Sequence, residues 1–204
     1  MEQGDTRIWS SEPGIAWKER ANLEAENDKK SKKGLIIVHT GDGKGKTTAA
    51  LGLAFRALGQ GFKVAMIQFI KGLTHYGELE SAKQFPNFEL IPMGRGFLRA
   101  GADEPLAEDV ALAHEALQLG REKIHSGQYQ IVILDEIGYA MHYKLVALEE
   151  VLDLLRAKPK DLHLVLTGRN MPPEVIEMAD LVTEMRPIKH PYQQGVKAQK
   201  GIEY

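Results

Sequence analysis

The sequence contains no cysteine among its 204 residues. This absence excludes disulfide bridges, cysteine-ligated zinc, iron–sulfur clusters and a thiol nucleophile. A strong charge of either sign is also missing, because 26 Lys and Arg stand against 28 Asp and Glu and leave a net charge of −2. We therefore expect no general attraction to nucleic acid or to anionic lipid, and any anion must bind at a local site.

Long apolar runs and a secretory signal are missing as well. No apolar run reaches the length of about 18 residues that a membrane-spanning helix needs. The start of the chain lacks the basic, apolar and small-residue regions of a signal peptide. We expect a cytoplasmic protein without membrane association, in which one α/β domain carries a short appendage.

The most informative stretch is residues 34–48, GLIIVHTGDGKGKTT. Its apolar, β-branched beginning is typical of a buried parallel strand, and a glycine-rich loop follows. Backbone N–H groups of such a loop and the positive end of the next helix converge on phosphate. Lys46 adds a mobile charge and Thr47 a hydroxyl that can bind Mg²⁺. The usual pattern has glycine where this chain has Thr40, so these residues predict a bound nucleoside triphosphate but leave its orientation open.

A second informative stretch is residues 131–136, IVILDE. Apolar residues that end in Asp135 and Glu136 are typical of a strand whose carboxylates reach the Mg²⁺ beside a phosphate loop. About 90 residues separate the two stretches, and apolar strands alternate with helical segments around them. Strands are expected at 35–38, 63–69, 88–93, 131–134, 162–167 and 181–185, and helices at 47–58, 76–85, 105–125, 145–156 and 172–178. This order predicts a mainly parallel sheet of about six strands with helices on both faces, the P-loop NTPase (RecA-like) class, over residues 34–204.

Residues 1–33 differ from the rest of the chain and predict an appendage outside the sheet. A weak apolar stripe at residues 15–27 indicates a helix that needs a surface to lie on. The lysines at 29–33 stand beside several acids and are interpreted as a solvated linker. Farther on, Arg169 follows an apolar strand and is expected at the sheet edge where ligands bind.

These residues predict a bound Mg²⁺-nucleotide but leave the reaction open. Water could attack the γ-phosphorus with Glu136 as its base, as in an ATPase or switch that acts on a protein partner. An acceptor hydroxyl could attack instead, as in a kinase with Arg95 and Arg99 in a lid. A nucleophile could also attack the ribose 5′ carbon and release the whole triphosphate. In a fourth, non-enzymatic alternative, the protein is a carrier that only binds a nucleotide or a corrinoid.

Several segments resemble the ATP:corrinoid adenosyltransferases, which act on cob(I)alamin. They are TGDGKGKTTAALGLAFRALGQG at 40–61, IQFIKG at 67–72, VILDEIGYAMHY at 132–143, LTGRN at 166–170, EMRPIKH at 184–190 and GVKAQKGIEY at 195–204. The resemblance covers residues 34–204, and its carboxyl-terminal segments are not shared by kinases or motor ATPases. It implies transfer of the 5′-deoxyadenosyl group of ATP to Co(I) of a reduced corrinoid, with release of tripolyphosphate and with ATP reversed in the loop.

The resemblance also implies roles for particular residues. Lys46, Thr47 and Thr48 would hold the triphosphate, Thr47 and Glu136 the Mg²⁺, and Arg56 a phosphate. Phe97 matches an aromatic residue that displaces the lower axial ligand of cobalt, whereas Arg99 replaces a second aromatic. The nucleotide-binding residues expected in all are Thr40, Gly41, Asp42, Gly43, Lys44, Gly45, Lys46, Thr47, Thr48 and Arg56, and the catalytic ones are Lys46, Glu136 and Phe97.

The same resemblance implies partners. A homodimer is expected, in which the helix at residues 15–27 covers the corrinoid site. Because Co(I) must be generated by reduction, an electron donor such as a flavodoxin or a reduced flavin is expected as well.

Overall fold

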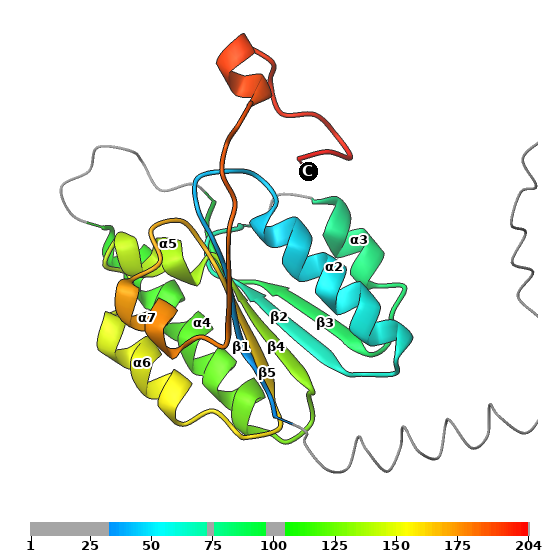
Figure 1. Cartoon of the computed structure of the whole chain (residues 1–204), viewed down its shortest axis with the longest axis vertical. Helices are drawn as coiled ribbons and strands as arrows, with labels where there is room; N and C mark the ends of the chain where they lie inside the picture. The colour runs from blue at the N-terminus through cyan, green and yellow to red at the C-terminus, as the bar shows by residue number, and fades with distance from the viewer. Residues whose placement is uncertain (1–32, 73–75, 97–104, 204) are drawn as a thin grey trace, which may run out of the picture. The chain divides into compact units, whose positions relative to one another are not determined.

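A parallel sheet of six strands forms the centre of the fold (Figure 1). The computed structural model describes residues 33–72, 76–96 and 105–203. The strands are β1 (Ile36–Thr40), β2 (Val64–Gln68), β3 (Phe88–Pro92), β4 (Ile131–Asp135), β5 (His163–Thr167) and β6 (Leu181–Glu184). Their order is β3-β2-β4-β5-β1-β6, and every neighbouring pair is parallel. The six predicted strands and the predicted α/β class are confirmed.

Helices cover both faces of the sheet, as Figure 1 shows. On one face lie α2 (Lys46–Gly59) and α3 (Gly77–Ala82), and on the other lie α4 (Ala107–His125), α5 (Ile137–His142), α6 (Leu148–Arg156) and α7 (Pro173–Met178). A short 3-10 helix, η1 (Pro191–Gln194), follows in the carboxyl-terminal segment. Helix α5 was not predicted, because its six residues are too few to show helical periodicity. The helix predicted at 145–156 begins only at Leu148.

Burial on both faces explains why the strands are continuous apolar runs. Alternate strand residues point to opposite faces. On one face, Ile37 and Ile133 pack with Ala50 and Ala54 of α2. On the other face, the neighbouring strand residues pack in a larger cluster that includes residues of α4, α5, α6 and α7. Because β5 alone separates β1 from β4, this packing holds the carboxyl ends of those two strands near each other.

Several sequence predictions lie outside the described residues, namely the helix at 15–27, nearly all of the linker at 29–33, and the loop residues Phe97 and Arg99. From Gly34 onward the chain forms one compact unit. Within the described ranges, no helix combines the length and the apolar character that crossing a membrane requires.

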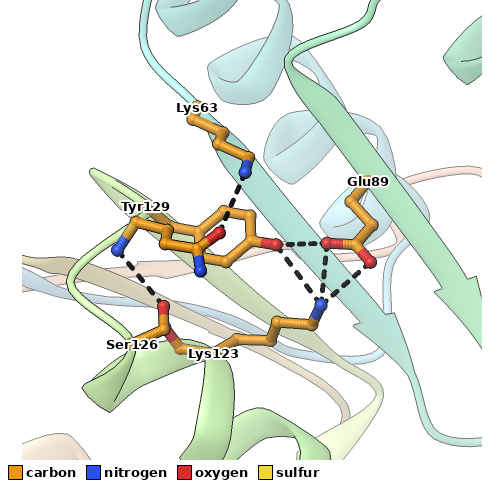
Figure 2. A network of polar contacts seen from close by, with 6 residues as sticks. Lys63, Glu89, Lys123, Ser126 and Tyr129 are labelled. Carbon is orange, nitrogen blue, oxygen red and sulfur yellow. Dashed lines mark hydrogen bonds and ion pairs between the residues drawn. The ribbon is translucent and has the colours of Figure 1, made fainter.

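A polar network ties the edge strand β3 to the end of α4, at the amino-terminal end of the strands (Figure 2). Lys123 Nζ donates to both carboxylate oxygens of Glu89 at 2.9 Å, and the hydroxyl of Tyr129 donates to the same carboxylate. Lys63 Nζ lies 4.8 Å from the centre of the Tyr129 ring. Burial would raise the pKa of Glu89, but the hydrogen bonds from Tyr129 and Lys123 outweigh it and hold that pKa below its ordinary value.

We expect Glu89→Gln to lower the free energy of unfolding at neutral pH by about 0.5 kcal/mol, the size of a partly exposed ion pair. Since the folded-state pKa of Glu89 is depressed, its contribution is present above the unfolded pKa and is lost as pH falls through the folded pKa. Denaturant titrations should therefore show a stability difference above about pH 5 that closes toward pH 3. Glu115→Gln, at an exposed position of α4, is the control. A difference independent of pH would contradict a charge effect.

Candidate functional site

The loop between β1 and α2 surrounds the Lys46 side chain. Lys46 Nζ donates to the carbonyl oxygens of Gly41 and Gly43, at 2.7 and 2.8 Å. Burial lowers the pKa of Lys46, and the negative charge of Glu136 opposes this shift in part. An ammonium carries three N–H donors, so one donor remains for an anion at the loop. Helix α2 begins at Lys46 and adds the partial positive charge of its amino-terminal end.

The loop glycines lie against Met185, the residue that follows β6. The N–H of Gly43 donates to the Met185 carbonyl at 2.7 Å, and the N–H of Met185 donates to the Thr40 carbonyl at 2.8 Å. A Cβ atom on Gly43 would lie 2.8 Å from Met185 backbone atoms, and one on Gly41 would lie 2.5 Å from the Met185 oxygen. The two glycines are therefore needed for contact with the neighbouring strand as well as for the shape of a phosphate loop.

The carboxylate of Asp135 accepts hydrogen bonds from three different elements. Its Oδ1 accepts from the hydroxyl of Thr47 on α2, at 2.9 Å, and from the hydroxyl of Thr167 on β5, at 2.7 Å. Its Oδ2 accepts from the side-chain amide of Gln68 on β2, at 3.2 Å. Asp135, Thr167 and Gln68 are all fully buried and are the last residues of their strands. This arrangement fixes the Thr47 hydroxyl at the start of α2.

Glu136 has an unusual backbone conformation directly after β4. Its φ of 64° lies in the left-handed region, and it is the N-cap residue of α5. Its N–H donates to the Thr167 hydroxyl at 2.9 Å, which stabilises this turn. Burial and the charge of Asp135 raise the pKa of Glu136, against the opposing charges of Lys46, Lys71 and Arg169. Strained conformations of this kind concentrate at functional sites.

The oxygen atoms at this edge of the sheet fit a magnesium ion that is shared with phosphate. The Thr47 hydroxyl gives its hydrogen to Asp135, so its lone pairs remain available to a cation. Over the described ranges, no group of three or more His, Cys, Asp or Glu side chains is placed to hold a metal. A site with few protein ligands suits Mg²⁺, which usually keeps water and substrate phosphate in its coordination sphere.

The structure brings some of the predicted residues together and leaves others apart. Thr40 is buried at the end of β1, whereas Asp42 and Thr48 are exposed. Arg56 lies in the last turn of α2 and is exposed, about 15 Å along the helix axis from Lys46 at the usual rise per residue. Within the described chain Arg56 is therefore not beside the loop, and its contact with phosphate stays a prediction.

Lys44 on the loop pairs with Glu203 of the carboxyl-terminal segment. Lys44 Nζ lies 2.5 Å from Glu203 Oε1, and the other carboxylate oxygen of Glu203 accepts from the N–H of Gln199. The hydrogen bond from Lys44 lowers the pKa of Glu203. The segment GVKAQKGIEY, which had no structural role in the sequence-based prediction, thus contacts the loop.

Sequence reasoning did not identify the contacts of Asp135, Gln68, Thr167 and Met185. The predicted metal pair was Thr47 and Glu136, whereas the Thr47 hydroxyl contacts Asp135. One signal was present, since Gln68, Asp135 and Thr167 are each a polar residue at the end of an apolar strand. Their proximity depends on the order of the strands, which the sequence alone does not specify.

Comparisons of the sequence with a family model and with curated relatives agree on one family. The family model described as "ATP:corrinoid adenosyltransferase BtuR/CobO/CobP" matches residues 32–204. A corrinoid adenosyltransferase of Sinorhizobium sp. is 43% identical over 193 residues, covering 93% of this chain and 89% of the relative. One from Pseudomonas aeruginosa is 39% identical, covering 86% of each chain. The flagellar accessory protein FlaH of Methanocaldococcus jannaschii has a TM-score of 0.49 at 14% identity, over 78% of this chain and 76% of that one.

The contact between the loop and Met185 can be tested with two glycine substitutions. Gly43→Ala should lower the free energy of unfolding by about 1–3 kcal/mol, because its Cβ has no room beside Met185. Gly52→Ala is the matched control, since nothing lies within 4 Å of that Cβ in the middle of α2. It should raise the free energy of unfolding by about 0.5–1 kcal/mol. Equal stability of the two variants in denaturant titrations would show that Met185 does not constrain the loop.

Proposed function

This chain belongs to the ATP:corrinoid adenosyltransferase family, and we propose that it transfers the 5′-deoxyadenosyl group of ATP to Co(I) of a reduced corrinoid and releases tripolyphosphate. Membership in the family makes the protein a transferase that adenosylates corrinoids. The oxidation state of cobalt, the leaving group and the roles of individual residues are parts of the proposal.

The observation that carries the proposal is the buried Lys46 ammonium at the start of α2. Two of its N–H donors are fixed by loop carbonyls, which leaves the third in a preset direction. Negative charge grows on a triphosphate as it leaves, and positive groups that are already in place stabilise this charge without reorganisation. The loop therefore suits the triphosphate as a leaving group. That the ribose 5′ carbon is directed away from the loop is what the family resemblance implies.

The bond changes explain why no general base is assigned. Co(I) supplies the electron pair for the new cobalt–carbon bond, and the bond between the 5′ carbon and its phosphate oxygen breaks with its electrons on the triphosphate. Cobalt formally becomes Co(III), and no proton is removed. General base catalysis has no proton to take in this step. In this reaction Glu136 acts through its charge, and it does not activate water.

Magnesium would be held by Thr47 and Glu136, with Asp135 fixing the Thr47 hydroxyl. Bound there, Mg²⁺ supplies positive charge to the phosphate oxygens. Thr48 and the loop N–H groups complete the site for the triphosphate, except for the N–H of Gly43, which donates to Met185. This assignment uses oxygen donors only, as Mg²⁺ prefers.

The corrinoid side of the site is proposed from the family resemblance alone. Phe97 would displace the lower axial ligand of cobalt and so ease its reduction to Co(I). The helix predicted at residues 15–27 would cover the corrinoid in a homodimer. A flavodoxin or a reduced flavin would supply the electron, and the cytoplasm is where we expect the reaction to take place.

Product analysis tests the proposed reaction. The protein, Mg²⁺-ATP and chemically reduced cobalamin should give the adenosylated corrinoid and tripolyphosphate in equal amounts, measured by absorbance and by phosphorus NMR. Without corrinoid, no phosphate product should form. If ADP and inorganic phosphate appeared in place of tripolyphosphate, the proposal would be wrong and the ATPase alternative would be favoured.

Substitution of Lys46 tests the leaving-group argument. Lys46→Ala should lower kcat by about 100–1000-fold, the usual effect of losing one preorganised donor to a developing anion. The loss of ATP affinity should be smaller, because the charge that Lys46 stabilises is greatest in the transition state. Lys44→Ala, on the same loop but exposed and paired with Glu203, should change kcat much less. Equal losses in kcat/KM and in ATP affinity for Lys46→Ala would contradict the argument.

A further inference from the structure

Gln68 is a buried glutamine at the end of β2 to which the proposed reaction assigns no role. It pairs in register with Asp135 across the β2–β4 ladder, and its side-chain Nε2 donates to Asp135 Oδ2 at 3.2 Å. Its exposed fraction is 0%. Gln68 Oε1 is one of two buried side-chain polar atoms without a hydrogen-bond partner in the described ranges. A buried, unpaired carbonyl costs free energy, so the orientation of this amide is fixed by something other than its own oxygen.

The Asp135 carboxylate explains that orientation. Its Oδ2 accepts a hydrogen bond from the Gln68 amide. On the neighbouring helix α3, burial would raise the pKa of Glu78, but the hydrogen bond from Lys71 and its charge hold that pKa below its ordinary value. An ionised carboxylate only accepts hydrogen bonds, so the NH₂ group must face Asp135 and the oxygen must face away. Glu78 is in turn held by the Lys71 ammonium.

The amide controls the rotation of the Asp135 carboxylate. Both hydroxyl groups, of Thr47 and Thr167, donate to Oδ1, whereas the donor to Oδ2 is Gln68. Without Gln68, Oδ2 would lose this donor, and the plane of the carboxylate would be free to turn away from the orientation in which Oδ1 accepts from Thr47. The hydrogen bonds from Gln68 and from Thr47 to the same carboxylate thus connect Gln68 to the hydroxyl that would bind Mg²⁺.

We propose that Gln68 is a positioning residue that orients the Asp135 carboxylate, and through it the Thr47 hydroxyl, for Mg²⁺-dependent nucleotide binding. This inference rests on the proposed function, because it assumes that a Mg²⁺-nucleotide occupies the loop. It adds a role for a fully buried residue to which the proposed reaction assigned none. Residues that orient metal ligands in this way typically change metal affinity by about 10–100-fold when they are replaced.

The test measures ATP affinity by calorimetry with and without Mg²⁺, in the absence of corrinoid. We expect Gln68→Met to reduce the Mg²⁺-dependent gain in ATP affinity by about 10-fold, while ATP affinity without Mg²⁺ stays within about twofold. Gln118→Met is the matched control, because it removes an amide-to-carboxylate hydrogen bond at an exposed site of α4. If the Mg²⁺-dependent gain in ATP affinity were the same in Gln68→Met as in the unsubstituted protein, the inference would be overturned. Should that variant not fold, Gln68→Asn, which retains the amide but withdraws it by one methylene, undergoes the same measurement with the same two outcomes.

A double substitution separates positioning from a general loss of stability. If Gln68 acts through Asp135, adding Gln68→Met to Asp135→Asn should cause no further reduction of the Mg²⁺-dependent gain. If the reductions caused by the two substitutions were instead additive, the inference would be contradicted. It would also be contradicted if Gln68→Met lowered ATP affinity equally with and without Mg²⁺. Failure of the unsubstituted protein to bind Mg²⁺-ATP would instead contradict the proposed function, so the two failures are distinguishable.

Discussion

The site depends on the hydrogen bonds that the Asp135 carboxylate accepts. This carboxylate is fully buried, and burial of a charged group is costly unless hydrogen bonds replace its water. Three side chains from β2, β5 and α2 provide them. Since each donor comes from a different element, the carboxylate can be satisfied only when the sheet and the first turn of α2 are correctly assembled. Folding and formation of the site are therefore the same event at this position.

The same dependence extends along the carboxyl-terminal edge of the sheet. Gln68, Asp135, Thr167 and His39 occupy four adjacent strands, and their register places them in one row. Below the row the core on that face is apolar, so the transition from apolar to polar residues marks where the sheet ends and the site begins. His39 at the end of the row is buried, which lowers its pKa and favours its neutral form. The row thus carries its negative charge at the position nearest to Thr47.

The sequence was sufficient for the fold and for locating the phosphate loop and the acid pair along the chain, and the reason is physical. Strands buried on both faces give apolar runs, and the phosphate loop and the acid pair lie at the ends of two such runs. The contacts that complete the site depend on strand order and register, which bring Gln68 to Asp135 and Met185 to Gly43 from distant parts of the chain. Helix α5 was missed because it is short, and Arg56 was assigned to phosphate from resemblance, although it lies at the far end of α2.

The pair between Lys44 and Glu203 has a consequence for the effective charge of the loop. Lys44 is 42% exposed, so its attraction to Glu203 is weakened by dissolved ions, whose screening length is about 8 Å at physiological ionic strength. If a triphosphate binds the loop as proposed, it would compete with salt anions and with Glu203 for the same ammonium. The loop therefore has no single charge, since the strength of the attraction between Lys44 and Glu203 varies with ionic strength. Nucleotide affinities of this protein are comparable only between solutions of equal salt concentration.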